Sequence, residues 1–570
     1  MYNLKSRKML RKSFRLLIIL LIIQCFTNAA ESSEVLFSAM DKELQRTMET
    51  LSKEEKAPYF ISLNVTDIEQ VSITSRFGKL YNSSDNSSRI LDIDLRVGDY
   101  KFDNTHIIRG NPFNFGGGSG IVNLPLEDDE VSIRNAIWFA VDKRYRSAAE
   151  RLEKAVTNQA VKVAEEDSSA DFSKEKPITY KGKKERININ IKHWEDFTKS
   201  LSEEFNKYPW ILSSSVSFTG ENKAKYFTST EGSKLEWYET GCRIYVNAVT
   251  KADDGMSLPL YKSYFSFSPE GLPEIQTIVK DIEHMVELLS ELRYAPMAET
   301  FSGPAILSGE ASGVFFHEIF GHRVEGHREK DPNSSQTFKK SINKKILPEF
   351  IDVVFDPTLD KLRNTELSGF YKYDDEGVQS KKVVTVEDGI FKNFLMSRSP
   401  IEGFSMSNGH GRRQAGYSAV SRQSNLIVNA QETVSKDELR EMLKEEILKQ
   451  NKDYGLYFEA VSGGFTFTSR TIPNAFNVTP LVVYKVYPDD RPDELVRGVD
   501  LIGTPLMTFA NIVASADDMG IFNGICGAES GGVPVSACSP SLLVSTIEVQ
   551  KKQKSQAKPP ILASPLSEGQ

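Results

Sequence analysis

Histidine is scarce in this sequence, and its distribution points to a metal. The 570 residues contain seven histidines, and three of them fall within eleven residues, at His317, His322 and His327. Neutral imidazole is the commonest metal-ligand side chain. A catalytic zinc needs three protein ligands, an open coordination position and a nearby carboxylate that takes a proton from water. Glu318, directly after His317, is the candidate for that carboxylate. The competing interpretation is an amphipathic helix with surface histidines, because H-E-x-x-x-H strings also arise by chance.

The five-residue spacing of His317 and His322 does not suit a regular helix. An α-helix turns by about 100° per residue, so side chains five apart point roughly 140° away from each other. Gly321, and not His322, would share the face of His317. The two imidazoles can reach one ion only if the helix breaks or absorbs an extra residue in a π-bulge, a feature found mostly at functional sites. We therefore predict such a distortion near Phe320–His322, eased by the backbone freedom of Gly321.

A third ligand has to come from elsewhere in the chain. His327 would need a second distortion of the helix, and we interpret it as a surface residue. The sequence has four cysteines, Cys25, Cys242, Cys526 and Cys538, and removal of Cys25 with a signal segment leaves an odd number. One of the remaining three is then free, intermolecular or bound to something. The alternative for Cys526 is a small buried apolar residue in a Gly-rich turn, and Cys242 and Cys538 either pair or stay free.

The N-terminus has the order of a secretory signal. Basic residues between Lys5 and Arg15 precede an apolar run over Leu16–Phe26, and small residues follow up to Ala30. This run is too short to span a bilayer comfortably, so we predict a signal peptide over residues 1–30 and a secreted or periplasmic protein. An uncleaved anchor is the alternative. No other segment is apolar enough to cross a membrane. A formal net charge of −8 without a basic stripe argues against nucleic acid as the partner.

The remaining pattern predicts two domains, since 570 residues exceed what one core usually supports. Residues 31–295 alternate amphipathic helices, including 36–51, 137–156 and 275–289, with strands rich in β-branched residues. These strands are expected at Tyr59–Val65, Val71–Phe77, Ile90–Val97, Trp210–Phe218, Lys225–Thr228, Lys234–Ala248 and Tyr261–Phe267. A charged stretch over 165–184 is interpreted as an exposed linker or insertion. Residues 296–550 are expected to be β-rich, with a hairpin across Glu387–Gly389 and a helix over 436–450, before a disordered tail at 551–570.

Several motifs resemble, in order, those of the TldD/PmbA family of peptidases. The stretch from Leu307 through Glu318 to Gly326 is similar to that family's metal-binding signature. Further similarities follow at Asp374–Gly377, Gly411–Gln414, Arg422–Asn425, Leu501–Gly503, Gly524–Gly527 and Val533–Val535. The resemblance is specific over roughly residues 300–550 and looser over the N-terminal half.

The resemblance implies an α+β, two-domain architecture whose N-terminal domain mixes helices and strands and whose β-rich C-terminal domain carries a distorted metal-binding helix. It implies one Zn²⁺ per chain held by His317, His322 and Cys526, with Glu318 as general base for the hydrolysis of unfolded peptides. Because these four residues are retained, the chain resembles the catalytic, TldD-like type. Family members are dimers, so the implied partner is a second copy or a metal-free TldE/PmbA-like paralogue.

The sequence also departs from the family pattern and leaves other functions open. His327 replaces an acidic residue, an insertion interrupts the motif at Asn408–Arg412, the usual C-terminal Val-Gly-Gly is missing, and cytosolic members have no secretory signal. Arg412 and Arg413 are candidates for steadying the tetrahedral intermediate or a peptide carboxylate, or else form salt bridges on a strand edge. The alternatives to a peptidase are a secreted metal-containing binding or assembly subunit and a hydrolase of non-peptide amides. A structural zinc usually has four protein ligands, and the sequence offers no fourth, which favours catalysis.

Overall fold

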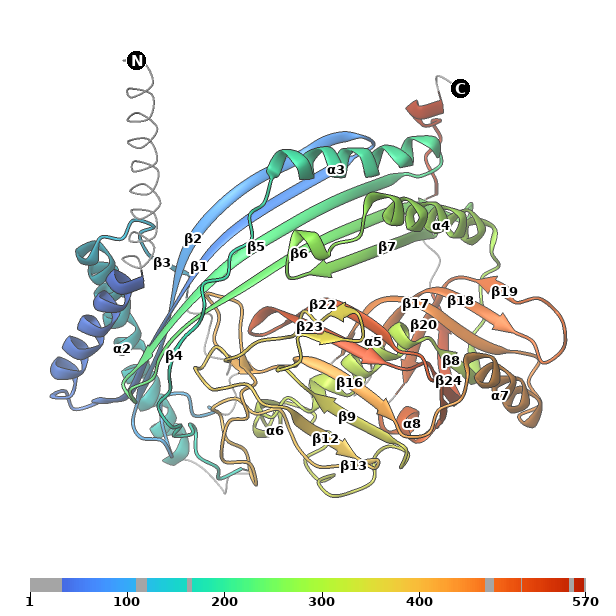
Figure 1. The fold of residues 1–570 in the computed structure, drawn as a ribbon. Coiled ribbons are helices and arrows are strands. Elements are labelled where there is room, and N and C mark those ends of the chain that lie inside the picture. Colours follow the sequence, from blue (N-terminus) through green and yellow to red (C-terminus); the bar gives the residue numbers. More distant parts are fainter. Residues whose placement is uncertain are drawn as a thin grey trace, which may run out of the picture.

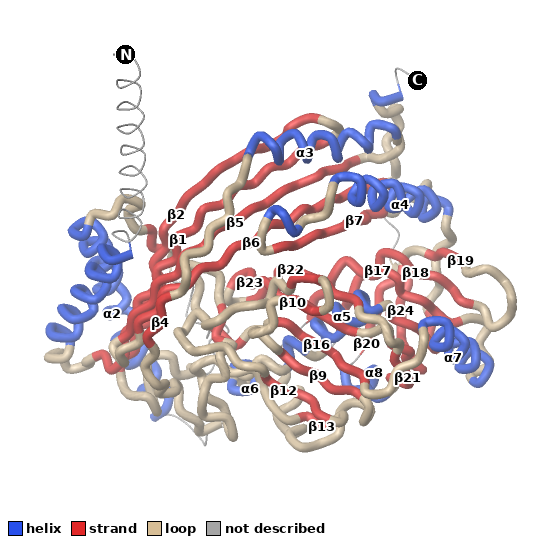
Figure 2. The backbone as a smooth tube through the Cα atoms, viewed as in Figure 1, coloured by secondary structure: helices blue, strands red, loops and turns tan. Residues whose placement is uncertain are grey.

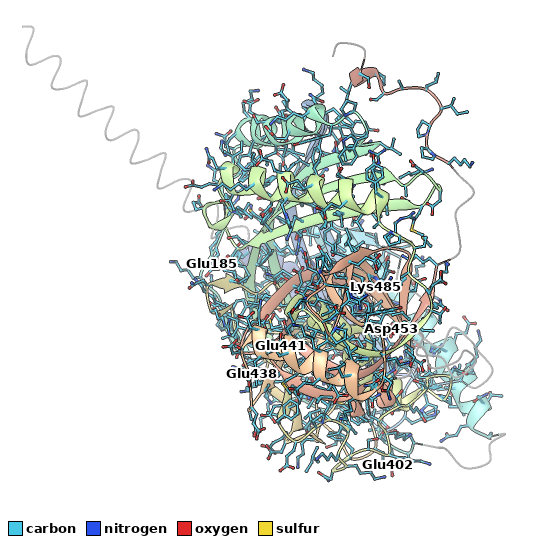
Figure 3. All side chains as sticks on the ribbon, turned by 90° about the vertical axis from the view of Figure 1, so that its right-hand side faces the viewer. Glu185, Glu402, Glu438, Glu441, Asp453 and Lys485 are labelled. Atoms are coloured by element: carbon cyan, nitrogen blue, oxygen red, sulfur yellow. The ribbon has the colours of Figure 1, made fainter. Side chains whose placement is uncertain are left out.

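The computed structural model describes residues 33–108, 120–160, 167–466, 476–503, 505–552 and 558–567. The predicted signal peptide, residues 1–30, lies outside these ranges. None of the helices in the described ranges is long and apolar enough to cross a bilayer. Acidic side chains such as Glu438, Glu441 and Asp453 lie on the surface (Figure 3), as the net negative charge of the chain leads one to expect.

The N-terminal half is built on one long, curved sheet that arches over the C-terminal half (Figure 1). Its strands follow the order β3-β2-β1-β5-β6, and β4 and β7 both pair with β6. The pairings are antiparallel except that of β4 with β6. The strands are β1 (Pro58–Arg76), β2 (Lys79–Val97), β3 (Val122–Asn123), β4 (Thr179–Lys181), β5 (Ser213–Ser229), β6 (Lys234–Lys251) and β7 (Ser257–Ser266).

Alternation along β1 explains how this sheet is covered. Ile61, Leu63 and Val65 pack in one core with the helix over residues 33–51 and with α2 (Glu130–Ala160). Val71 and Ile73, on the same face, pack in a second core with α3 (Ile191–Glu203) and α4 (Ile275–Tyr294). Successive side chains of a strand point to opposite faces, so the buried polar residues of even number face the C-terminal half. Asn64, for example, lies 3.4 Å from the Asp375 carbonyl oxygen, to which its Nδ2 donates.

The C-terminal half contains two further sheets (Figure 2). The first has the order β13-β12-β9-β16-β23-β22 and ends in β22 as an edge strand. In the second, β17, β8, β24, β20 and β18 pair in turn, and β18 pairs with β17 again, which closes a ring. The first sheet consists of β9 (Ile351–Phe355), β12 (Val383–Glu387), β13 (Ile390–Phe391), β16 (Asn425–Ala430), β22 (Gly520–Ala528) and β23 (Gly531–Ser539). The second consists of β8 (Phe301–Leu307), β17 (Gly455–Thr466), β18 (Phe476–Val486), β19 (Glu494–Val496), β20 (Val499–Gly503), β21 (Ile512–Ser515) and β24 (Leu542–Lys551).

Short helices and hairpins complete this half of the chain. Helix α5 (Gly309–Ile319) lies between the two sheets and contacts β17, β18, β22 and β23. Further short helices are η3 (Gly321–Arg323), a 3-10 turn, α6 (His327–Lys330), α7 (Lys436–Lys449) and α8 (Pro505–Ala510). Two small antiparallel ribbons are β10–β11 (Lys361–Leu362, Thr365–Glu366) and β14–β15 (Gly411–Arg412, Val420–Ser421). The predicted helix over 436–450 and the hairpin across Glu387–Gly389 are therefore confirmed, as is the mixed α and β architecture.

Three predictions about the N-terminal half are wrong. The segments Trp210–Phe218 and Lys225–Thr228 are not two strands, because Ser213–Ser229 form the single strand β5, which pairs with β1 and β6. The segments Tyr59–Val65 and Val71–Phe77 are one continuous strand, because the polar residues between them pair with β2 on one side and β5 on the other. The stretch over 165–184 is not simply exposed: within its described residues, Asp171, Phe172 and Ser173 are buried and 179–181 form β4. Residues 171–173 form a short strap that packs against the C-terminal half, where the Ser173 amide donates to the Arg398 carbonyl oxygen at 2.9 Å. The charged residues on both sides of this strap favour the wrong prediction.

Candidate metal centre

Helix α5 reaches the centre of the molecule because it can approach its neighbours closely. Its N-terminus is capped by Ser308, whose Oγ accepts a hydrogen bond from the Ala311 amide at 3.2 Å. A Cβ on Gly313 would lie 2.8 Å from the Ala537 carbonyl oxygen, so a glycine is needed for the helix to lie this close to β23. Apolar residues of the helix, including Val314, Phe315 and Phe316, pack in the main core. The C-terminal end of α5 is thereby held next to β22, the strand that carries Cys526.

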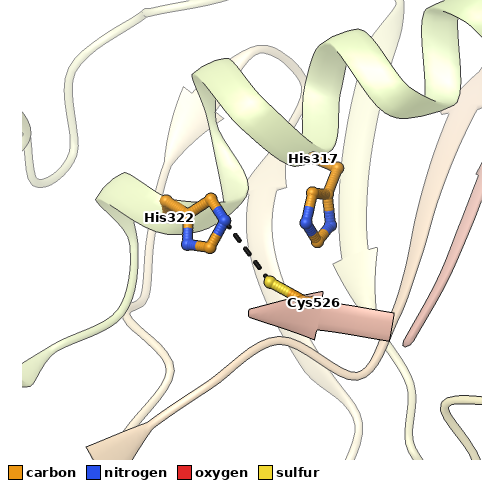
Figure 4. A group of neighbouring side chains, drawn as sticks. All are labelled: His317, His322 and Cys526. Atoms are coloured by element: carbon orange, nitrogen blue, oxygen red, sulfur yellow. Dashed lines mark hydrogen bonds between the residues drawn. The ribbon is translucent and has the colours of Figure 1, made fainter. Parts of the chain in front are cut away.

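The helix breaks where the histidine spacing predicts. Regular α-helix ends at Ile319, Phe320 adopts φ −112° and ψ −55°, and Gly321–Arg323 continue as a 3-10 turn. The predicted distortion is therefore a break, and not a π-bulge. It turns His322 back towards His317, and the ring centroids lie 5.1 Å apart with an angle of 77° between the planes. Figure 4 shows both imidazoles on the side of the helix that faces Cys526.

Gly321 matters for a different reason from the one expected. Its φ is not in the left-handed region, so the turn does not demand the conformational freedom of glycine. Instead, a Cβ at this position would lie 1.9 Å from the side-chain oxygen of Gln423. The Gln423 amide fills this space and donates through Nε2 to the His317 carbonyl oxygen at 3.2 Å. Glycine at 321 therefore allows the loop before β16 to lie against the broken helix.

The two histidines and Cys526 converge as a candidate ligand set. Their ligand atoms all lie within 4.8 Å of one another, and Cys526 Sγ is 3.4 Å from His322 Nε2. Tetrahedral zinc with bonds of about 2.3 Å to sulfur and 2.0–2.1 Å to nitrogen separates these atoms by about 3.6 Å, which is close to the observed distance. His317, His322 and Cys526 are 9, 7 and 5% exposed. The donor set, the spacing and the burial fit a zinc ion.

The charges of this cluster favour the thiolate form of Cys526. Burial alone would raise the pKa of the Cys526 thiol, but His322 and His317 outweigh it and hold that pKa well below its usual range. A thiolate is the form of cysteine that binds metals. The other two cysteines, Cys242 and Cys538, are buried and free, and burial raises the pKa of each to about 12. The disulfide alternative is thus wrong, and of these three cysteines only Cys526 lies beside the histidines.

Glu318, the residue after His317, faces the same cavity as the converging side chains. Its side chain is buried and lines the same cavity as His317, His322 and Cys526. This cavity has a volume of about 590 Å³ and is also lined by the β17 residues Ser462–Gly464. The end of α5 is held by Arg323, whose Nη1 donates to the Glu318 carbonyl oxygen at 2.9 Å and to that of Ile319 at 3.2 Å. The cavity is large enough for a stretch of extended peptide.

A buried carboxylate, Glu325, orients His322. Its Oε2 lies 3.3 Å from His322 Nδ1 and accepts a hydrogen bond of 2.8 Å from Arg328 Nε. Burial would raise the pKa of Glu325, but His322 and Arg328 outweigh it and lower that pKa to about 2. With Nδ1 bonded to a carboxylate, Nε2 is left as the atom that faces Cys526. Carboxylate–histidine–metal arrangements of this kind fix the ring and raise its basicity.

Replacement of Glu325 by glutamine is expected to weaken zinc binding by about 10- to 100-fold, the range measured for such supporting residues. The glutamine amide keeps the size of the side chain, but it is neutral. It therefore cannot balance the charge of Arg328, and it accepts only a weaker hydrogen bond from His322 Nδ1–H. Competition with a zinc-binding dye, at fixed pH, would measure the affinity. An affinity equal to that of the wild-type protein would show that Glu325 serves only the local ion pairs.

Arg422 ties the cysteine strand to this network. Its Nη2 donates to the Cys526 carbonyl oxygen at 2.6 Å, and its Nη1 donates to Ser530 Oγ at 2.6 Å and to the Gly531 carbonyl oxygen at 3.0 Å. Its Nε is 3.5 Å from Glu325 Oε1. Arg422 is fully buried. It therefore fixes the turn after β22 relative to the residue that orients His322.

The structure corrects the interpretation of His327. It is 8% exposed, and its Nε2 contacts the carboxylate of Glu529, which also accepts from Arg328 Nη2 at 3.0 Å. The segment that carries it is not a solvent-facing helix exit, because the Gly326 amide bonds to the Leu395 carbonyl oxygen at 2.8 Å and anchors it. His327 is therefore buried, and it is not among the three residues whose ligand atoms converge.

Arg412 and Arg413 both lie outside the metal cavity. The Arg412 guanidinium donates to the carbonyl oxygens of Gln423 and Pro534, at 2.6 and 2.8 Å, and stacks on Tyr371. Arg413 lines a different cavity, with Nε 3.5 Å from Asp92 Oδ2. Arg412 thus holds loops together and does not reach the metal cavity.

The sequence pattern indicates the three side chains that converge, but not the residues that support them. Glu325, Arg422 and Gln423 lie within the family-like motifs Leu307–Gly326 and Arg422–Asn425. Their positions in the sequence, however, do not indicate that they contact His317, His322 or Cys526. Nothing in the sequence connects Glu529 with the histidines. The available hint for Arg328 is the run of charged residues over 323–330, directly after an apolar helix.

Comparison with known proteins places this site in a family. Residues 300–551 match the model of the PmbA/TldA metallopeptidase C-terminal domain. These residues, which include the three converging side chains, are similar to the TldD/PmbA family. A metalloprotease of Methanocaldococcus jannaschii is 26% identical over 332 residues, which cover 57% of this chain and 67% of that protein. A zinc metalloprotease TldD homologue of Saccharolobus solfataricus is 29% identical over 250 residues, covering 43% of this chain and 51% of that one.

Solved structures of the TldD/PmbA type share the fold at low sequence identity. TldE from Thermococcus kodakarensis superposes with a TM-score of 0.60 at 13% identity, covering 90% of this chain and all of that one. A chain from Thermotoga maritima superposes with a TM-score of 0.58 at 15% identity, covering 89% and 99%. These similarities confirm the α+β architecture that the motifs implied.

Proposed function

We propose that this protein is a zinc-dependent peptidase that hydrolyses unfolded peptides, with His317, His322 and Cys526 as the metal ligands. The observation that carries the proposal is the convergence of these three buried ligand atoms within 4.8 Å of one another, beside a cavity that Glu318 also lines. Two imidazoles and one thiolate supply three protein ligands, the number found in catalytic zinc sites, and leave the fourth position for water or substrate. Zinc, when bound there, supplies a Lewis acid that polarises a carbonyl and lowers the pKa of water.

The protein's own side chains carry the proton transfers. Glu318 accepts a proton from the attacking water and delivers it to the leaving amine, the role of a general base that becomes a general acid. Glu325 holds the tautomer and ring orientation of His322 through the contact with Nδ1. Arg328, which lines the cavity and bonds to Glu325, keeps that carboxylate ionised. Burial of the ligands excludes bulk water from the side of the metal that faces the core.

We further propose that the active protein is a dimer, with a second copy or with a TldE-like paralogue, and that it acts outside the cytoplasm. The fold shared with TldE supports the first part. The basic, apolar and small residues of the N-terminus support the second.

Removal of the metal provides the test of the proposed function. Protein purified with zinc is expected to cleave a pool of unstructured peptides and to lose this activity after treatment with a chelator, with recovery on addition of zinc. Elemental analysis gives the expected one zinc per chain. A chain that holds zinc but cleaves no peptide, alone or with its paralogue, would favour a binding or assembly subunit. Identification of the products would separate a peptidase from a hydrolase of other amides.

A further inference from the structure

A second cavity, of about 580 Å³, lies beside the metal cavity and is enclosed by both halves of the chain. Glu529 lines both cavities, while His327 lines the second and Arg328 the first. Since Glu529 contacts His327 and accepts a hydrogen bond from Arg328, these three residues form the wall between the cavities. The second cavity therefore adjoins the metal cavity across these three side chains.

Most charged groups around the second cavity are satisfied by partners. Arg398 pairs with Glu231 at 2.8 Å, and Lys330 pairs with Asp171 at 3.2 Å. Arg144, from α2, is an exception within the described residues. It is partly buried, and the charges that act on it, those of Asp94, Asp92 and Arg413, stand beyond ion-pair contact. A buried cation without a bonded partner is costly unless an anion reaches it.

Arg413 is the second guanidinium in this cavity, and its pairing is loose. Its Nε lies 3.5 Å from Asp92 Oδ2, and this oxygen is buried without a hydrogen bond. The other oxygen of Asp92 accepts from the Gly416 amide at 2.9 Å. A guanidinium has five N–H donors in a planar fork, which matches the two oxygens of a carboxylate. Asp94 also acts on Arg144 and Asp375 on Arg413, so the two guanidiniums lie among three carboxylates. Within the described residues, neither guanidinium has a side-chain hydrogen bond, and the contact of Arg413 with Asp92 is the one ion pair between these groups.

We propose that Arg144 and Arg413 form a receptor for a carboxylate of the peptide substrate, so that an anionic group enters the second cavity while the peptide bond to be cleaved lies at the metal centre. This inference rests on the proposed peptidase function and names a substrate class for it: peptides that carry a carboxylate a short distance from the cleaved bond. The carboxylate is that of the C-terminus or of an acidic side chain, since both present the same two oxygens.

Cleavage of matched peptides tests the receptor. We compare kcat/KM for three series of peptides. The first has a free C-terminus, the second is the same peptides amidated, and the third is amidated peptides that carry one Asp or Glu. We expect the wild-type protein to prefer one of the two anionic series, which identifies the source of the carboxylate. Arg144→Gln should lower kcat/KM for that series by roughly 10- to 100-fold, as for the loss of a charge-assisted hydrogen bond, and leave the neutral peptides unchanged. Arg144→Lys should recover part of the loss.

Arg146→Gln is the matched control, because Arg146 lies on the same helix, is exposed, and pairs with Asp142 at 2.9 Å. It should behave like the wild-type protein with every peptide. If Arg144→Gln discriminates among the peptides as the wild-type protein does, or slows all of them equally, the receptor does not exist.

A binding measurement separates this inference from the peptidase proposal. Full-length Glu318→Gln protein is titrated with N-acetyl-trialanine and with its C-terminal amide, and with the amide carrying one glutamate. Preferential binding of an anionic peptide, lost on the additional change Arg144→Gln, supports the receptor even if no cleavage is found with the wild-type protein. Equal binding of anionic and neutral peptides contradicts it.

Discussion

Glu318→Gln is expected to abolish most peptide hydrolysis while the protein keeps its zinc. The glutamine has nearly the same size and can occupy the same buried position, but it accepts no proton from water at neutral pH. Loss of a general base typically costs about 10²- to 10⁴-fold in rate, and the loss should appear in kcat with a smaller change in KM. Metal content is measured on the same samples by elemental analysis, so that the two effects are not confused.

Glu310→Gln is a suitable control for this experiment. Glu310 lies in the first turn of the same helix, on the surface and away from the metal cavity. It should leave both zinc content and activity unchanged. If Glu318→Gln keeps full activity, another group takes the proton and the mechanism is wrong. If it loses zinc, Glu318 is a metal ligand, and the set of His317, His322 and Cys526 is incomplete.

The broken helix could be predicted because its cause is local. Helical geometry makes residues five apart diverge, so a shared ion between His317 and His322 required a distortion within three known residues. The exact form of the distortion depends on tertiary contacts. The loop that carries Gln423 lies against Gly321, and a 3-10 turn leaves the space that this side chain fills, which no local rule reveals.

The remainder of the site could not be predicted, because its side chains contact residues far away in the sequence. His327 was interpreted as a surface residue because its neighbours read as a helix exit, whereas Glu529, 202 positions away, buries it. The same holds for the strap at 171–173: charged flanks masked Phe172, which packs under Arg398 with 3.9 Å between the guanidinium carbon and the ring centroid. In both places a charged or polar sequence is buried because its partners lie far along the chain, and single-sequence patterns carry no record of such partners.

The strands show the same division between local and distant causes. Alternation identified the apolar segments at both ends of β1 because one face of each packs on helices. The centre of the strand, Thr66–Gln70, is mostly polar, so the pattern predicts a loop between two strands there. It continues as a strand because β2 and β5 satisfy its backbone on both sides, and this ladder is invisible until the sheet order is known.

Replacement of Cys526 by serine is expected to remove the zinc with little change in the fold. The thiolate is the ligand that distinguishes this set, and a neutral hydroxyl is a poor substitute for it. Loss of a direct ligand should exceed the effect of losing a supporting residue, so we expect zinc affinity to fall by roughly 100-fold or more and hydrolysis to fall with it. Cobalt substitution gives a direct readout, because a thiolate ligand produces a sulfur-to-cobalt charge-transfer absorption that the serine variant must lack.

Cys538→Ala is the control that isolates the ligand role. Cys538 lies on β23, paired with β22 in the same sheet, and is fully buried away from the histidines. Its change should alter stability slightly and leave the cobalt spectrum intact. A normal spectrum in Cys526→Ser would mean that sulfur does not bind the metal. In that case the low pKa of Cys526 reflects only its pairing with imidazolium, and the odd number of cysteines in the chain has no bearing on the metal.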